Sequence, residues 1–173
     1  MLQYVYKIKC RIFFMQENTH SHNEKAKAII HENKYMVLAT SDKESKPWAS
    51  PVFFAHDEKY NLYFLSSINS RHAKNILANP NVGIAIFDSR QKMGHTEGLQ
   101  IEAVAGQIGK NSLDKAIEHY CMKAFPNSGS GLSPSERYNP NEYIEPHDLR
   151  FFKVSPEKIY IVDVEKRVAV DIF

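Results

Sequence analysis

The sequence predicts a mainly β protein, a small antiparallel barrel with flanking helices. Three observations favour this class: many short segments have strand-like patterns, few segments have helical periodicity, and no internal repeat is present. A chain of 173 residues with 43% hydrophobic residues can build one core. We therefore expect a single domain over residues 21–165, between an N-terminal extension of residues 1–20 and a C-terminal tail of residues 166–173.

No function is expected in the N-terminal extension. Residues 5–14 alternate with a strand-like period, so they form an extra edge strand, or else they precede a natural start at Met15. Basic residues interrupt this apolar stretch, which disfavours a signal peptide. A capping box from Ser21 to Glu24 then predicts a helix packed on the barrel.

Strands are expected where apolar residues alternate or form short runs between turn residues. The expected strands are residues 35–40, 47–55, 62–66, 82–87, 99–108, 149–154 and 158–163. The first two should pair as a hairpin, and so should the last two, across Ser155-Pro156. Pro51 predicts an edge, a bulge or a non-strand neighbour, because proline cannot donate a ladder hydrogen bond. Gly106 is a candidate bulge.

Two further helices are expected. The first runs from Ser70 to Asn79, and the second from Leu113 to Ala124, where apolar residues recur with the clearest amphipathic pattern in the chain. Residues 127–148 are rich in Ser, Pro, Asn and Gly, and this length predicts a lid or a flexible loop. Ser133–Glu136 within it has the capping pattern of one helical turn.

Composition excludes several function classes. The formal net charge of +2 gives no broad basic surface for duplex DNA or an anionic membrane, and no apolar run reaches the roughly 20 residues of a membrane span. Cys10 and Cys121 form no CxxC pair, so a reduced, cytoplasmic setting is expected. No metal site is expected, because the short His and Cys pairs have no further ligands. The expected partners are small molecules and a second copy of the chain.

The most informative segment is residues 46–80. Two aromatic-rich strand patterns there lead into a polar turn with Ser66, Ser67, Ser70 and Arg71, and the turn opens a helix. Backbone N–H groups at a helix start are unpaired, so hydroxyl groups and a guanidinium placed there can hold a dianion. The sequence therefore predicts a phosphate-binding corner.

The segments WASPVFF, LYFLSS and SRHAKNIxxNPxV, in this order, resemble the flavin-binding core of the pyridoxamine 5'-phosphate oxidase-like split-barrel family. The likeness continues through GLQIEAVAG, LRFFKVSP and EKIYIVD. It implies an antiparallel split β-barrel of Greek-key type and a homodimer with FMN at its interface. The final residues VEKRVAVDIF differ from the arginine-rich end of the true oxidases, so the chain looks nearer to the short members grouped with general stress proteins.

The resemblance implies a set of cofactor-binding residues. Ser66, Ser67 and Arg71 would contact the ribityl phosphate. His72 stands where the family often has a lysine, which predicts weaker retention of FMN, and Lys74 would reach the phosphate only if its long stem curled back.

Other implied positions lie on two strands. Ser50 and Val52 match the strand whose backbone runs along the edge of the isoalloxazine ring, and Trp48 is expected in the core, at the dimer contact or beside the ring. Gln100 resembles a glutamine that faces the cofactor from the partner subunit; alternatively, it is a polar residue on the outer face of a strand.

These features favour an FMN-dependent oxidoreductase that transfers electrons between a small substrate or NAD(P)H and an acceptor, with no catalytic residue identified. The alternative is a non-catalytic binding protein for flavin, haem or a deazaflavin, with His72 or His95 as a haem ligand. A third interpretation is an interaction module without a working pocket.

Overall fold

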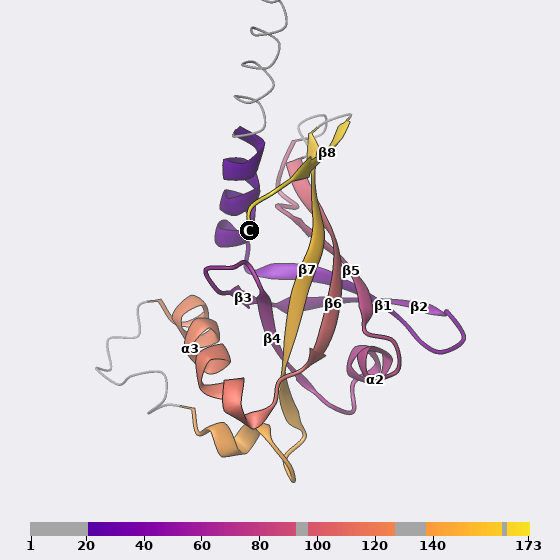
Figure 1. The fold of residues 1–173 in the computed structure, drawn as a ribbon, viewed down its shortest axis with the longest axis vertical. Coiled ribbons are helices and arrows are strands. Elements are labelled where there is room, and N and C mark those ends of the chain that lie inside the picture. Colours follow the sequence, from indigo (N-terminus) through magenta and orange to yellow (C-terminus); the bar gives the residue numbers. More distant parts are fainter. Residues whose placement is uncertain (1–20, 93–96, 127–137, 164–165) are drawn as a thin grey trace, which may run out of the picture.

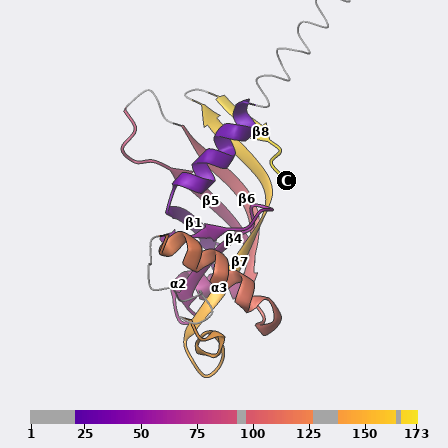
Figure 2. The same ribbon diagram turned by 90° about the vertical axis from the view of Figure 1, so that its left-hand side faces the viewer.

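The computed structural model describes residues 21–92, 97–126, 138–163 and 166–173. Within these ranges, eight strands form one antiparallel sheet in the order β2-β1-β5-β6-β7-β4-β3, with β8 paired to β7. The strands are β1 (Tyr35–Ser41), β2 (Pro47–Phe53), β3 (Ala55–His56), β4 (Leu62–Ser67), β5 (Asn81–Phe87), β6 (Glu97–Gln107), β7 (Leu149–Asp163) and β8 (Lys166–Val170). The sheet curls into an open half-barrel, as Figures 1 and 2 show. The predicted split-barrel class is confirmed.

Helices flank the sheet. Residues 21–32 are helical, as the capping box predicts, and this helix lies beside the upper part of the sheet (Figure 1). The other helices are α2 (Arg71–Ala78), α3 (Leu113–Ala124) and the short 3₁₀ helices η1 (Lys110–Ser112) and η2 (Pro140–Tyr143). In the described part of the chain, no helix has the length and apolar composition needed to cross a bilayer.

The predicted second strand is divided at Phe54. The side chain of Phe54 is fully buried, and its backbone N–H donates to the carbonyl of Lys34 instead of continuing the ladder with β1. As a result β2 lies at one edge of the sheet and β3 at the other edge, beside β4. The edge position of β2 explains how Pro51, opposite Val37, is tolerated, as the sequence predicts.

The predicted hairpin across Ser155-Pro156 is wrong. Residues 149–163 form the single strand β7, which pairs with β4 through its first part and with β6 along most of its length. Pro156 lies opposite Ala103 at a register shift, where an irregular ladder accommodates a residue without an N–H. Gly106, the predicted bulge, is paired in register with Lys153. β7 pairs instead with β8, which lies within the predicted C-terminal tail of residues 166–173.

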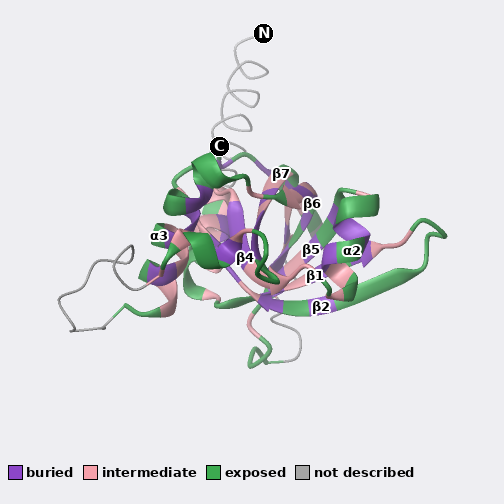
Figure 3. Ribbon diagram, turned by 90° about the horizontal axis from the view of Figure 1, so that it is seen from below, coloured by how far each residue is buried: buried purple, intermediate pink, exposed green. Residues whose placement is uncertain are grey.

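Two groups of buried residues hold the fold together. Figure 3 colours the buried residues purple along the ribbon. The larger group fills the concave side of the sheet, where the rings of Phe64 and Phe152 stack with their centroids 5.0 Å apart. The smaller group lies under α3, whose predicted apolar stripe is buried at Leu113, Ala116, Ile117 and Cys121.

Part of the expected lid is anchored to this smaller group. Tyr143 of η2 is only 5% exposed, and its ring packs edge-on against Phe151 at 5.0 Å. Ser133–Glu136 and His95 lie outside the described residues, so the lid and its helical turn stay predictions.

Candidate cofactor site

Helix α2 is fixed to the sheet by amide and hydroxyl groups. Ser70 caps its first turn, where Oγ accepts a hydrogen bond from the N–H of Ala73 at 3.3 Å. Asn75 is 4% exposed and donates from Nδ2 to Thr40 Oγ1 on β1 at 3.0 Å. Asn79 ends the helix and donates to Ser41 Oγ at 3.0 Å. The start of α2 is therefore held at a defined position relative to β1.

Three elements meet at that helix start in a Ser–His cluster, formed by Ser50, Ser66, Ser70 and His72. Ser66 Oγ on β4 lies 2.7 Å from His72 Nε2 and 3.2 Å from Ser70 Oγ. His72 Nδ1 lies 3.1 Å from Ser50 Oγ on β2. Burial lowers the pKa of His72, so its imidazole is neutral at pH 7. One ring nitrogen donates to a serine and the other accepts from a serine.

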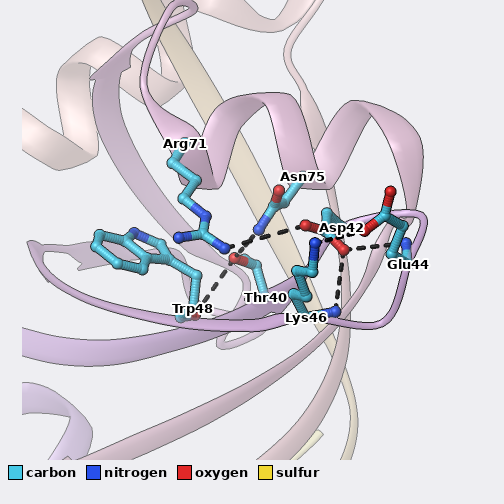
Figure 4. A network of polar contacts seen from close by, with 7 residues as sticks. All are labelled: Thr40, Asp42, Glu44, Lys46, Trp48, Arg71 and Asn75. Carbon is cyan, nitrogen blue, oxygen red and sulfur yellow. Dashed lines mark hydrogen bonds and ion pairs between the residues drawn. The ribbon is translucent and has the colours of Figure 1, made fainter.

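Arg71 makes different contacts, because its side chain lies beside Trp48 and reaches towards Asp42 (Figure 4). Its guanidinium carbon lies 4.5 Å from the centroid of the Trp48 ring, and Nη2 lies 4.0 Å from the Asp42 carboxylate. Successive helix residues project about 100° apart, which explains why Arg71 and His72 face different groups. The predicted phosphate corner thus consists of two neighbouring parts, the Ser–His cluster and an Arg71–Trp48 pair.

The guanidinium of Arg71 is loosely held. Its separation from Asp42 is at the limit of an ion pair, and the Oδ1 atom of Asp42 already accepts from the N–H groups of Glu44 and Lys46 at 3.0 and 2.9 Å. The Arg71 side chain is 45% exposed. This arginine can therefore turn towards an incoming anion without breaking a short hydrogen bond.

The remaining predicted residues lie in different places. Val52 is buried in the larger core group, whereas Trp48 is 42% exposed on the edge strand. Ser67 Oγ accepts from the N–H of Asn69 at 3.1 Å, which is a local turn contact. Lys74 is exposed on α2.

Gln100 lies on the convex face of the sheet, apart from the Ser–His cluster. It is exposed on β6, opposite Ala85 of β5 and Tyr160 of β7. It lines a shallow hollow of about 340 Å³ with small residues that include Ala39 and Gly83. None of the residues of the phosphate corner lines this hollow.

One functional candidate has no signal in the sequence. Arg150 is 5% exposed on β7, opposite Ser66, and its Nη1 donates to the carbonyls of His147 and, at 2.8 Å, Leu149. A single arginine in the apolar segment LRFFKV does not reveal whether it is buried. The structure shows that it holds the turn before β7, next to the phosphate corner.

Comparisons with known proteins agree with this fold. The family model described as pyridoxamine 5'-phosphate oxidase matches residues 22–163. A search of curated proteins found no match.

Solved structures with the same fold include three that illustrate its range. A haem-binding protein from Mycobacterium smegmatis superposes with a TM-score of 0.65 at 18% identity, over 86% of this chain and 57% of that protein. HutZ, a haem storage protein from Vibrio cholerae, superposes with a TM-score of 0.57 at 23% identity, over 80% of this chain and 92% of HutZ. A putative pyridoxamine 5'-phosphate oxidase from Listeria innocua superposes with a TM-score of 0.57 at 22% identity, over 81% of this chain and 97% of that protein. At these identities the likeness establishes the fold alone.

Proposed function

Because the chain belongs to the pyridoxamine 5'-phosphate oxidase family, we propose that it binds FMN between two copies of itself and acts as a cytoplasmic oxidoreductase. Electrons would pass between a small substrate or NAD(P)H and an acceptor. The observation that carries the proposal is the phosphate corner: the Ser–His cluster and the Arg71–Trp48 pair surround the start of α2.

The donors at this corner fit a phosphate monoester. Arg71 supplies a full positive charge that is free to turn, and Ser66 and Ser70 supply hydroxyl groups beside the positive end of the α2 dipole. His72 supplies no charge, because its imidazole is neutral and both its nitrogens are hydrogen-bonded. We therefore expect FMN to be held more weakly than by a site with two cations.

The convex face of the sheet supports the proposed homodimer. Its exposed residues on β1, β2 and β5 include Ala39, Ala49, Pro51 and Gly83, whose small side chains allow a second sheet to approach closely. In such a dimer, Gln100 of the partner subunit would hydrogen-bond a carbonyl of the flavin ring. The flavin would supply the reversible electron transfer, while the protein orients it and excludes water.

Titration with FMN and with riboflavin tests this function. Bound FMN should show bands near about 370 and 450 nm. Arg71→Ala should raise the Kd for FMN about ten- to a hundred-fold, the usual effect of losing a charged hydrogen bond, and leave the Kd for riboflavin nearly unchanged. Lys115→Ala, which removes an exposed lysine of α3 outside the phosphate corner, is the matched control and should bind FMN normally. Absence of saturable FMN binding to the unaltered protein would exclude the proposal.

A haem-binding function is the second candidate, since two proteins with this fold are a haem-binding protein and a haem storage protein. In this chain, His72 would have to release Ser66 or Ser50 before it could ligate iron. An intense Soret band that is lost in His72→Ala would favour haem. A deazaflavin would compete with FMN for the phosphate corner and is distinguished by its absorption spectrum.

A further inference from the structure

A separate cavity of about 480 Å³ lies between α3, the end of the helix of residues 21–32 and the turn between β3 and β4. We name it the α3 cavity. It is remote from the phosphate corner, since α2 and α3 lie on opposite sides of the molecule in Figure 1. Its volume is within the range of about 300–1,000 Å³ that is typical of small-molecule sites. No residue of the candidate cofactor site lines it.

Lys123 of α3 lines this cavity, and its amine has no acidic partner among the residues that the structure describes. Its Nζ donates to the carbonyl of Ile30 at 3.0 Å and lies 3.9 Å from the centroid of the Phe54 ring. Among the described residues, no carboxylate oxygen lies within 4.0 Å of this nitrogen. Burial lowers the pKa of Lys123 to about 8, so a substantial fraction of the amine is neutral near pH 7.5.

Three imidazoles line the cavity, and two of them, those of His56 and His119, are placed to transfer protons. His119 lies one helical turn before Lys123, on the same face of α3, and its ring stacks on Tyr63 with centroids 5.8 Å apart. His56 Nδ1 lies 2.9 Å from the carbonyl of Asp57 and must donate to it, which leaves Nε2 as an acceptor. Burial and the charge of Lys123 both lower the pKa of His56, so it is a neutral base at pH 7.

The charges around the cavity disfavour an anionic ligand. Glu32, Asp57 and Glu58 line its wall, against Lys34 and Lys123. Asp57 is already engaged, because its carboxylate accepts from Tyr63 Oη at 2.9 Å and from Asn61 Nδ2 at 2.8 Å. A neutral ligand that reacts with an amine therefore fits the site better than a carboxylate or a phosphate.

We propose that the α3 cavity is a reactive-lysine site for small aldehydes, in which Lys123 forms an imine. The lone pair of Nζ adds to the carbonyl carbon, and both hydrogens of the neutral amine end on the carbonyl oxygen. That oxygen leaves as water and a C=N bond remains, so no oxidant or reductant is consumed. His56 and His119 would carry protons between the nitrogen and the oxygen. This site is independent of the proposed flavin function.

Reductive labelling of the full-length protein tests the proposal. The protein is treated with benzaldehyde and sodium cyanoborohydride at about pH 7.5, and the labelled lysines are identified by peptide mass mapping. Lys123 should be labelled at least about ten-fold faster than Lys115, an exposed lysine on the same helix. Equal rates at the two lysines would overturn the proposal.

Further experiments test whether the fast labelling of Lys123 depends on the folded site. Lys123→Arg should remove the fast labelling, whereas Lys115→Arg should leave it intact. In urea-unfolded wild-type protein, the preference for Lys123 should disappear, and a preference that persists there contradicts a site made by the fold. His119→Gln should slow the labelling of Lys123 several-fold without changing that of Lys115; unchanged labelling would remove His119 from the site.

Discussion

Ser66 Oγ lies 2.7 Å from Nε2 of His72, and this hydrogen bond joins the end of β4 to the first turn of α2. The other ring nitrogen of His72 bonds to Ser50 on the edge strand β2. A neutral imidazole thus connects three elements at the proposed phosphate corner. The same contact makes the histidine a structural link, while burial lowers the pKa of its ring, so it contributes no charge to the site.

This link predicts a pH-dependent stability. Burial lowers the pKa of His72 in the folded protein, whereas in the unfolded chain this histidine has its ordinary pKa of about 6.5. As the pH falls below about 6.5, the unfolded chain therefore binds more protons than the folded protein. The stabilisation is complete above that value and is lost as the pH falls towards the folded pKa. We expect the Tm to decrease from pH 7.5 to pH 5.5, and to decrease less in His72→Gln, when both are measured by circular dichroism.

His147→Gln is the matched control for this experiment, because the His147 side chain is exposed in the turn before β7. It should leave the pH profile unchanged. The pKa of His56 is also lowered by burial, so His72→Gln should flatten the dependence of Tm on pH only in part. A profile identical to that of the unaltered protein would exclude His72 as a source of the pH dependence.

The fold could be predicted where the relevant pattern is local. Leu113–Ala124 repeats apolar residues at helical spacing, and Leu113, Ala116, Ile117 and Cys121 of this repeat are buried. The path of β7 could not be predicted in this way. Ser155-Pro156 has the composition of a turn, and only its pairing with β6, about 50 residues earlier in the chain, keeps the strand continuous. Long-range pairing overrides the local preference here.

In the candidate site, too, the local part could be predicted and the long-range contacts could not. Ser66, Ser70 and Arg71 are close in sequence, and their gathering at a helix start follows from a strand–turn–helix pattern. The partners of the site are distant: Ser50 lies 22 residues before His72, and Trp48 reaches Arg71 from the edge strand. Sequence spacing does not specify which serine faces the imidazole or which ring faces the guanidinium.

The buried pair of Asn75 and Thr40 predicts a measurable coupling. Asn75→Ala leaves the Thr40 hydroxyl without its donor and should lower the free energy of unfolding by about 1–3 kcal/mol. Thr40→Val should also destabilise the protein. In the double variant the free energy of unfolding should decrease by less than the sum of the two single decreases, because neither partner is then left unpaired. Urea denaturation of the four proteins gives the coupling directly. Strict additivity would mean that this hydrogen bond does not position α2.

Arg150 predicts a local effect on the turn before β7. Arg150→Met keeps much of the buried volume but removes the donor to the carbonyls of His147 and Leu149. We expect faster cleavage by proteases within residues 144–149, because the turn loses its internal link. Arg167→Met, an exposed arginine on β8, is the control and should be cleaved like the unaltered protein. Cleavage at equal rates in both variants would show that the turn is held by its other contacts.

Gly83 offers a test of the proposed dimer that spares the fold of the single chain. It is exposed on the convex face of β5, and a Cβ atom added there would meet only the Ala39 Cβ atom, at an ordinary 3.8 Å. Gly83→Asp should therefore fold, but a charge buried between two sheets is unfavourable, so the variant should be monomeric in sedimentation experiments. Gly106→Asp, in β6 and with nothing within 4 Å of its added Cβ, is the matched control and should stay dimeric. If Gly83→Asp stayed dimeric, the subunits would associate through another face, and Gln100 could not reach a flavin held by its partner.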